Sequence, residues 1–302
     1  MTRLRNPLPY LIAISFMWGS AYLFLKIASV EIPPLLLAAL RAAVAVPVLV
    51  IICIMQSGFV LTKASLRDML VIGTLNGWLP NALASYAITM ISSSEAGVLQ
   101  ATTPIITAML AASLLRDETL SVKAGLCLAG GFVGVVLIVA SSGNTGASGS
   151  LTGYVLMMGV AASFGAGAVY ARWAKPRAPA LVAFGQLAVA ASVALGASFA
   201  AGESWDIEWS GKVLFAVLML GAFCTALPAM LFLVVISRYQ AAKVGAASFL
   251  QPVWAILLGF LFLAERISLP QFVGAAVIIA AVFVITMHRS RKELGGSVKG
   301  NV

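Results

Sequence analysis

Residues 73–80 read Gly-Thr-Leu-Asn-Gly-Trp-Leu-Pro, and residues 221–228 read Gly-Ala-Phe-Cys-Thr-Ala-Leu-Pro. The two stretches are 148 residues apart, and they share a glycine at the start and a Leu-Pro pair at the end. At the same spacing and without a gap, Pro104 matches Pro252. An ungapped series of this kind indicates that the chain contains two copies of one structural unit.

The composition places both copies in a lipid bilayer. Of the 302 residues, 61 % are hydrophobic and 10 % are charged, and the mean hydropathy is +1.04. A soluble domain carries about a quarter charged residues, so this chain is predicted to be an all-α membrane protein that crosses the bilayer many times. The same composition excludes a disordered chain, a coiled coil and a secreted disulfide scaffold.

Ten segments contain the roughly 20 apolar residues that a membrane-spanning helix needs. The third and the eighth are long enough to be tilted or broken. The predicted spans are Leu8–Ser29, Pro33–Met55, Leu66–Met90, Ser94–Leu115, Ser121–Ala140, Leu151–Trp173, Ala178–Ala201, Lys212–Ser237, Lys243–Leu263 and Leu269–His288.

The positive charges indicate the orientation of these spans. With ten spans both termini lie on one side of the membrane, and 15 of the 19 Lys and Arg residues fall on that side. Three fall on the other side, and Arg41 lies inside a span. Because positive charge accumulates on the cytoplasmic side, both termini are predicted to be cytoplasmic in an inner-membrane protein. The net charge of +9 therefore indicates orientation rather than a nucleic-acid partner.

The copies are predicted to cross the membrane in opposite senses, because each contains an odd number of spans. The expected fold is ten transmembrane helices arranged as two inverted five-helix repeats around a central cavity, which is typical of secondary transporters. The first repeat covers 1–140, a Gly/Ser-rich external linker covers 141–150, the second repeat covers 151–288 and a basic cytoplasmic tail covers 289–302.

Four spans carry polar and aromatic side chains at helical spacing on otherwise apolar helices. Such stripes face a cavity or a neighbouring helix, since lipid offers no hydrogen bonds. Both interpretations stay open, because polar side chains also hydrogen-bond between packed helices. The candidates for substrate binding are Trp18, Tyr22, Trp78, Asn81, Gln100, Thr103, Gln251 and Trp254.

Prolines predict where the helices break. Pro80, Pro104, Pro228 and Pro252 lie within helical patterns, where proline breaks or kinks a helix. Breaks at matched positions of two halves point to the binding region of a transporter. Glycines in the fifth and tenth spans instead allow close backbone approach, and these two helices are predicted to pack outside the permeation path.

Three charged residues predict a gate. Lys26, Arg41 and Glu95 lie toward the external ends of their predicted helices. Arg41 follows Pro34 by seven residues, or roughly 10 Å along the axis, and needs a partner or water at that depth. We expect Glu95 to pair with Lys26 or Arg41 as part of an outer gate, and static pairing or snorkelling is the alternative.

The sequence lacks the patterns of an enzyme. The single histidine, His288, ends the last predicted span, and no phosphate-binding loop with a Gly-Lys-Ser/Thr motif is present, so ATP is not expected as the energy source. The three cysteines lie in apolar runs and fit neither a disulfide nor a metal site. No cofactor and no metal are expected. No carboxylate lies in the middle of a span, which favours gradient-driven movement over carboxylate-based proton exchange.

The ordered motifs resemble the drug/metabolite transporter superfamily, specifically its EamA-type ten-helix exporters. The resemblance extends from about Leu8 to His288 and implies inverted halves around a central cavity and export of small metabolites, nearest to amino-acid exporters of the YddG type. Two positions depart from the pattern in the second half, where Phe164-Gly165-Ala166 replaces Trp-Gly-Ser and Gln186 stands in the place of Arg41. The motifs are Trp18-Gly19-Ser20 followed by Lys26, Leu40-Arg41, Ala96 with Pro104 and Glu118, and Pro252 with Glu265-Arg266.

The expected function is therefore secondary transport. We expect export of small amphipathic metabolites, foremost amino acids including aromatic ones, by alternating access without ATP. A proton-coupled drug or metabolite antiporter of the same fold is one alternative, and a lipid-handling or structural membrane protein is another. The expected partners are a small-molecule solute and the lipid bilayer, and a monomer is the simplest assembly.

Overall fold

A computed structural model gives the fold over residues 8–56, 62–114, 150–174, 179–229, 247–265, 268–270 and 272–280, together with residues 126, 129–130, 133–134, 137 and 231. Apart from Ser150, the predicted linker lies outside these residues, and so does the predicted tail. Most of the predicted fifth span and parts of the last three also lie outside them.

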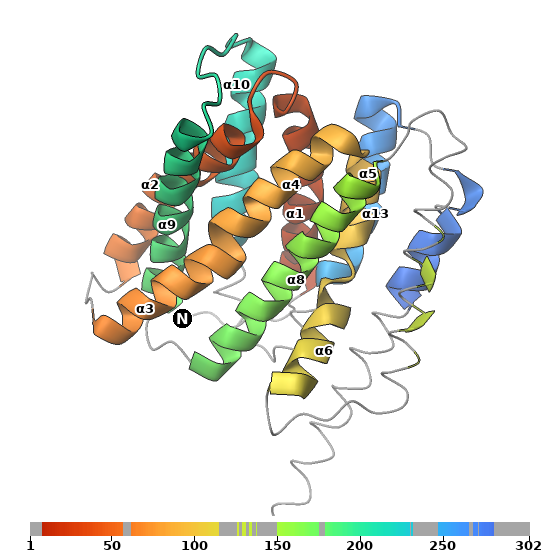
Figure 1. Ribbon diagram of the computed structural model, residues 1–302, viewed down its shortest axis with the longest axis horizontal. Coiled ribbons are helices and arrows are strands. Elements are labelled where there is room, and N and C mark those ends of the chain that lie inside the picture. The colour runs from red at the N-terminus through yellow and green to blue at the C-terminus, as the bar shows by residue number, and fades with distance from the viewer. Residues whose placement is uncertain are drawn as a thin grey trace, which may run out of the picture.

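The described chain is built from helices (Figure 1). Two of them, η1 and η3, are short π-helical segments that continue directly from an α-helix. The elements are α1 (Leu8–Ala28), α2 (Pro34–Gln56), α3 (Lys63–Gly73), η1 (Thr74–Trp78), α4 (Leu79–Met90), α5 (Ser93–Gln100), α6 (Thr103–Leu114), α8 (Leu151–Ala174), α9 (Pro179–Ala200), α10 (Gly211–Leu218), η3 (Met219–Ala226) and α13 (Ala247–Leu263).

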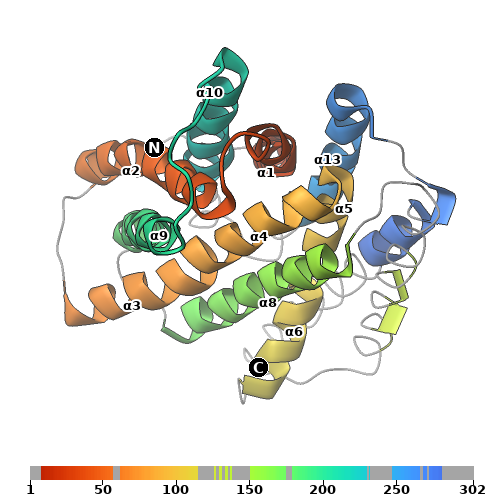
Figure 2. The same ribbon diagram turned by 45° about the horizontal axis from the view of Figure 1, so that its top comes forward.

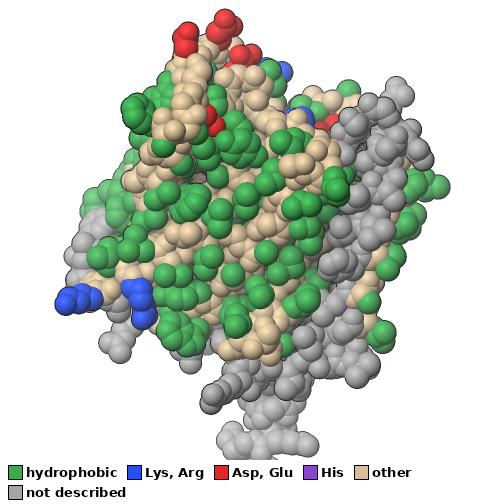
Figure 3. Space-filling model, in the orientation of Figure 1, with side chains coloured by type: hydrophobic (Ala, Val, Ile, Leu, Met, Phe, Trp, Pro, Cys, Tyr) green, Lys and Arg blue, Asp and Glu red, His purple; other side chains and the backbone are tan. Residues whose placement is uncertain are grey.

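Length and composition identify these helices as membrane spans. Within the described residues, five helical stretches are long and apolar enough to cross a bilayer: Pro34–Met55, Ser93–Leu114, Leu151–Ala171, Leu181–Ala200 and Gly211–Ala229. Exposed apolar side chains cover much of the surface in Figure 3. A water-soluble monomer does not expose apolar surface on this scale, so the described part of the chain is a helical membrane bundle.

The helices pack in pairs that combine the two halves of the sequence. The most extensive contacts join α2 to α9 and α1 to α13, followed by α4 to α8, and α2 and α9 and also α4 and α8 lie side by side in Figures 1 and 2. The main apolar core includes Leu25 and Leu37 from the first half and Met157 and Leu220 from the second. Residues of both halves therefore meet throughout the interior.

At Leu79-Pro80 and Leu227-Pro228 the predicted irregularity is a π-helical segment within a helical stretch, and we call η1 with its Leu-Pro pair the first break and η3 with its Leu-Pro pair the second break. η1 ends at Trp78, and the N–H of Leu79 donates to the carbonyl five residues back. η3 ends at Ala226, and the N–H of Leu227 does the same. The wider π turn is a common irregularity at functional sites and beside proline.

The other matched prolines, Pro104 and Pro252, differ in their effect on the helix. Helix α5 ends at Gln100 and α6 begins at Thr103, so the helix breaks at Pro104 as predicted. Helix α13 continues from Ala247 to Leu263 through Pro252, so of the two predicted effects, a break or a kink, the break does not occur there. A membrane helix tolerates proline when its surroundings satisfy the freed carbonyl, so proline alone does not decide whether a helix ends.

Charged side chains gather at two opposite ends of the bundle (Figure 3). The connection between α9 and α10 holds Glu203, Asp206 and Glu208, and we call this end the acidic end. The start of α3 holds Lys63 and Arg67, and we call that end the basic end. Helices α1, α4, α9 and α13 end at the acidic end, where α2, α5, α8 and α10 begin.

Candidate functional site

The first helix break is closed by side chains from the second half of the chain. Pro80 has no N–H, so it leaves a carbonyl without its helical donor at Leu75 in the π register or at Asn76 in the α register. The Ser163 hydroxyl of α8 donates to the Leu75 carbonyl at 2.7 Å. The Gln186 amide of α9 donates to the Asn76 carbonyl at 2.9 Å. Neutral donors thus satisfy both of the carbonyls that Pro80 affects.

The second break receives a positively charged side chain from the first half. Arg41 of α2 donates through Nε to the Thr225 hydroxyl at 2.8 Å. Thr225 in turn donates to the Leu220 carbonyl at 2.7 Å, and Ser20 of α1 lies 3.4 Å from the Cys224 sulfur. Arg41 is half-buried, and no carboxylate of the described residues lies within 4 Å of it. A guanidinium inside the bundle without such a counter-ion is suited to bind an anionic group.

A glycine at each break allows close contact with the helix of the opposite half. A Cβ atom at Gly73 would lie 2.8 Å from the Cβ of Val189, and one at Gly221 would lie 2.5 Å from the Cβ of Val44. Each glycine also faces a backbone carbonyl of that same helix, from Gln186 and Arg41 respectively. Only a residue without a side chain fits such a crossing, so the breaks sit at equivalent helix crossings.

Aromatic side chains gather beside the second break. The Phe16 ring of α1 contacts both the Phe223 ring of η3, at 6.1 Å between centroids, and the Trp254 ring of α13, at 5.2 Å. The Trp254 indole N–H donates to the Ser15 hydroxyl at 3.2 Å. A Cβ atom at Gly19 would lie 2.6 Å from the Cβ of Trp254, so α1 and α13 approach closely here. Trp254 was predicted, whereas Phe16 and Phe223 were missed, since isolated phenylalanines in apolar helices carry no distinguishing pattern.

Two other predicted residues lie where α5 meets α6. Gln100 ends α5 and donates to the Thr103 hydroxyl at 3.2 Å, while Thr103 donates back to the Gln100 carbonyl at 2.8 Å. The Gln100 Oε1 is buried and accepts no hydrogen bond from the described residues, and the same holds for the hydroxyl of Ser85 in α4. Unpartnered buried polar atoms are uncommon in folded proteins, so these two atoms mark hydrogen-bonding capacity that the described part of the bundle leaves unused.

Trp78 and Asn81 lie at the first break, apart from this group. The Trp78 indole donates to the Thr74 hydroxyl at 3.3 Å, and its ring packs against a small cluster that includes Ala38 of α2 and Ala194 of α9. Asn81 is buried in α4. The structure therefore places Trp78 against α2 and α9, where packing between helices explains its position, and it places Asn81 in the interior of the bundle.

The remaining predicted substrate residues lie on α1 and α13. Tyr22 is buried in the main core and is an electrostatic neighbour of Arg41. Trp18 is half-buried on α1, and Gln251 is half-buried on α13, where its carbonyl faces Gly19. Because α1 and α13 are in extensive contact, the structure brings these residues to the same side of the bundle as Trp254.

The three predicted gate residues are held by separate contacts. The Lys26 ammonium donates to the carbonyls of Ile88, at 2.5 Å, and Ile91, at 2.8 Å, at the end of α4. Lys26 is also attracted by two carboxylates, those of Glu265 and Glu95. Arg41 is bound to the second break, as described above. Lys26 therefore lies close to the predicted acidic partner while it also caps α4.

Glu95 has several partners of its own. Its carboxylate accepts hydrogen bonds from the backbone N–H and the hydroxyl of Ser92, both at 2.9 Å, and so caps α5. It also accepts a hydrogen bond of 2.7 Å from the Tyr154 hydroxyl of α8. Only 8 % of Glu95 is exposed, which shows that a carboxylate is buried near the acidic end.

Two acidic contacts between helices were missed by sequence reasoning. The Glu265 carboxylate after α13 accepts hydrogen bonds from the backbone of Ser93 and Ser94 at the start of α5. Near the basic end, Asp68 of α3 is buried and accepts a hydrogen bond of 2.9 Å from Tyr170 of α8. Glu265 itself could be singled out in the sequence, because it belongs to the motif Pro252 with Glu265-Arg266. Its partner Ser94 could not, because the two residues are 171 positions apart. No spacing rule connects Asp68 to Tyr170.

Comparison with known proteins agrees with this architecture. The sequence profile of the EamA-like transporter family matches residues 7–140 and residues 151–287. One solved crystal structure, of a protein 19 % identical to this chain, covers 94 % of this chain and 98 % of its own with a TM-score of 0.66, which indicates the same fold.

Two relatives illustrate the family. The uncharacterized transporter YoaV of Bacillus subtilis is 24 % identical over 286 residues, which cover 94 % of this chain and 98 % of the relative. The uncharacterized inner membrane transporter YedA of Escherichia coli K12 is 26 % identical over 292 residues, which cover 95 % of this chain and 94 % of the relative. Together with the apolar helices and the two matched stretches, these findings show that the chain belongs to the EamA-like transporter family and is a multi-pass inner-membrane transporter of small solutes.

Proposed function

We propose that this transporter exports small amphipathic metabolites, foremost amino acids including aromatic ones, by alternating access without ATP. The observation that carries the proposal is the guanidinium of Arg41 at the second break, an electrostatic neighbour of Tyr22, together with the aromatic rings of Phe16, Phe223 and Trp254 beside the same break. A carboxylate binds well to a guanidinium, and an apolar side chain packs well against aromatic rings. The proposed contact residues are Trp18, Tyr22, Trp78, Asn81, Gln100, Thr103, Gln251 and Trp254.

Alternating access in this proposal rests on two inverted five-helix repeats, 1–140 and 151–288, joined by the linker 141–150. The matched glycine crossings at Gly73 and Gly221 support it, since each faces the same turn of the equivalent helix in the other half. A second pair supports it too, because Gly19 packs on Trp254 and Gly165 on Thr107. Rocking of one repeat against the other then opens the central site to each side in turn.

The acidic end faces outward in this proposal and the basic end faces the cytoplasm, with both termini. Glu95, Lys26 and Arg41 form the outer gate, in which Glu95 pairs with Lys26 or Arg41 when the gate closes. Attraction between Glu95 and Lys26 supports such a pair.

The proposal is tested with purified protein in vesicles loaded with labelled phenylalanine, threonine or a sugar nucleotide. We expect both amino acids to leave the vesicles without ATP and the sugar nucleotide to stay inside. Retention of both amino acids would contradict the proposed substrate class. In the same vesicles Glu95→Gln tests the gate: unchanged efflux together with unchanged labelling of cysteines near the acidic end would contradict it.

A proton-coupled antiporter remains the second candidate, because two carboxylates are buried. Asp68 is 4 % exposed and Glu95 is 8 % exposed, and each is bound by a tyrosine of α8, Tyr170 and Tyr154 respectively. Buried ionisable groups commonly mark proton pathways in transporters. Efflux measured with and without an imposed pH gradient separates the candidates, since gradient-following transport does not require the pH gradient.

A further inference from the structure

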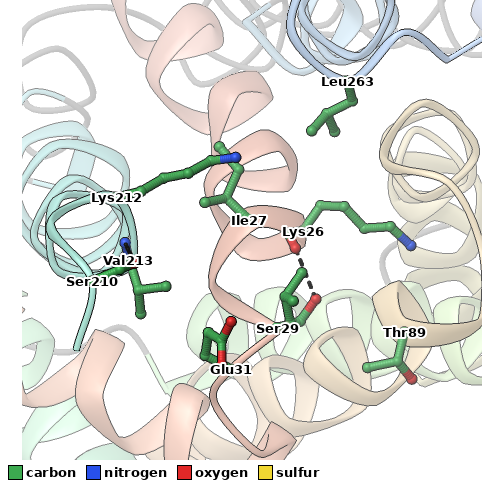
Figure 4. Close-up of a pocket in the computed structure, with 10 residues that line it drawn as sticks. Lys26, Ile27, Ser29, Glu31, Thr89, Ser210, Lys212, Val213 and Leu263 are labelled. Carbon is green, nitrogen blue, oxygen red and sulfur yellow. Dashed lines mark hydrogen bonds between the residues drawn. The ribbon is translucent and has the colours of Figure 1, made fainter. Parts of the chain in front are cut away.

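A pocket of about 370 Å³ opens at the acidic end, away from the two helix breaks (Figure 4). The end of α1 and the loop after it form one wall. The start of α10, the end of α4 and the end of α13 form the others. The volume falls within the range of small-molecule sites, roughly 300–1,000 Å³. The pocket is therefore large enough for a metabolite.

Two opposite charges in this pocket lack partners within the described part of the chain. Lys212 from α10 and Glu31 from the loop after α1 both line the pocket, and in Figure 4 the Lys212 side chain reaches toward Ile27 while Glu31 lies below it. Neither side chain forms a hydrogen bond or an ion pair with a described residue. An ammonium and a carboxylate that line one pocket without pairing with each other are complementary to a ligand that carries both charges.

The rest of the lining sets further limits on the ligand. Lys26 also lines the pocket, but its ammonium already donates to two carbonyls and so has one of three donors left. Ile27, Val30, Val213 and Leu263 provide apolar surface between the charged groups. A ligand with two charges and an apolar portion matches this pattern better than an inorganic ion or a sugar.

We propose that this pocket is an external binding site for the zwitterion of an α-amino acid with an apolar side chain. Lys212 binds the carboxylate, Glu31 binds the ammonium, and the side chain packs on Ile27 and Leu263. The inference rests on the proposed function and on the outward orientation of the acidic end. Because Lys212 and Glu31 are both exposed, each contact is weak in water, and a weak site suits a solute that is being released.

The test uses vesicles with the acidic end outside, loaded with labelled phenylalanine, and measures inhibition of efflux by external compounds. Three compounds separate the charges: phenylalanine has both, 3-phenylpropionate has only the carboxylate and phenethylamine has only the ammonium. Lys212→Gln is expected to raise the half-inhibiting concentration of phenylalanine and 3-phenylpropionate about three- to tenfold. Glu31→Gln is expected to do the same for phenylalanine and phenethylamine.

The matched controls are Glu208→Gln, an exposed acid at the same end outside the pocket, and Lys63→Gln at the basic end. For both controls, the half-inhibiting concentrations of all three compounds are expected to equal those of the wild type. Unchanged inhibition in Lys212→Gln and Glu31→Gln, or an equal shift for all three compounds, would overturn the proposal. A wild type that does not release phenylalanine would instead overturn the proposed function, and this inference with it.

A phospholipid headgroup is the other source of paired charges. Phosphatidylethanolamine carries an anionic phosphate and an ammonium, so the measurements are repeated in vesicles with and without it. A shift in half-inhibiting concentration that persists in pure phosphatidylcholine supports a free amino acid. A shift that appears only with phosphatidylethanolamine assigns the pocket to the lipid and overturns the proposal.

Discussion

At the first helix break Ser163 and Gln186 donate to backbone carbonyls, whereas at the second break Arg41 donates to the hydroxyl of Thr225. Both breaks consist of a π-helical segment that ends directly before a Leu-Pro pair. Both are crossed by a helix of the opposite half at a glycine. The backbone arrangement is thus shared, and the difference lies in the side chain that reaches across.

The two breaks share a backbone geometry, whereas the chemistry of the side chain that contacts each break differs. Glycine and proline fix the shape of both breaks, since close approach and a missing N–H act in the same way in either half. Gln186 stands in the place of Arg41, and an amide there completes the backbone hydrogen bonds of the first break. The second break keeps a positive charge, so two breaks of similar backbone geometry differ in their electrostatics. Membership of the EamA-like transporter family sets aside a purely structural role, and in the proposed function the asymmetry between the two breaks serves solute binding.

The largest expected effect comes from removing this charge. Arg41→Gln makes the second break resemble the first. We expect the initial efflux rate of phenylalanine at low internal concentration to fall about 10- to 150-fold, because a charged hydrogen bond contributes about 1.5–3 kcal/mol. Initial efflux rates over a range of internal concentrations measure the change.

Arg41→Lys and Lys63→Gln serve as controls for this prediction. The first keeps the charge and is expected to retain part of the transport, and the second removes a charge at the basic end and is expected to transport normally. Wild-type efflux in Arg41→Gln would show that the charge has no role in binding.

The next effect concerns the crossings that the two breaks share. Gly221→Ala and Gly73→Ala each force a methyl group against a neighbouring helix, and we expect a loss of stability of about 1–3 kcal/mol in each case. Gly221 is the tighter of the two, with 2.5 Å to the Val44 Cβ against 2.8 Å to the Val189 Cβ. Unfolding in detergent by a denaturant measures both variants.

Gly196→Ala is the matched control, because a Cβ atom at Gly196 of α9 has no neighbour within 4 Å. Alanine favours the helix at such a position, so stability is expected to stay the same or to rise slightly. A loss at Gly73 without a loss at Gly221 would contradict the equivalence of the two crossings.

Much of the fold was predictable from the sequence, because a bilayer imposes simple rules. The apolar runs predicted α1, α2, α8 and α9 to within a few residues, since a membrane helix has a fixed minimum length. The repeated Leu-Pro pairs also predicted both breaks. Pro252 shows the limit, because α13 continues through it, and a proline is accommodated or not according to its surroundings.

The candidate site was predictable only in part. Arg41 stood out, since a charge within an apolar run is costly and needs a reason. Its contact with Thr225 did not, because the two residues are 184 positions apart. The same applies to the Glu95–Tyr154 and Asp68–Tyr170 bonds. Polar stripes show which face of a helix is directed away from lipid, but the residues that contact this face depend on how the helices pack.

The smallest expected effect tests why Gln186 lies at the first break. Gln186→Ala removes the donor to the Asn76 carbonyl, and we expect a loss of stability of about 1–2 kcal/mol, because a part-buried carbonyl is left unpaired. Pro80→Ala restores a backbone N–H at the break, so Gln186→Ala is expected to cost less in that background, with a coupling of about 0.5–1 kcal/mol. In a Pro228→Ala background the cost should stay at its wild-type value, since that proline belongs to the other break. An equal cost in all three backgrounds would mean that Gln186 stabilises the packing of α9 on η1 rather than the backbone. The closure of the first break would then have a different cause from the one that the comparison with Arg41 assigns to it.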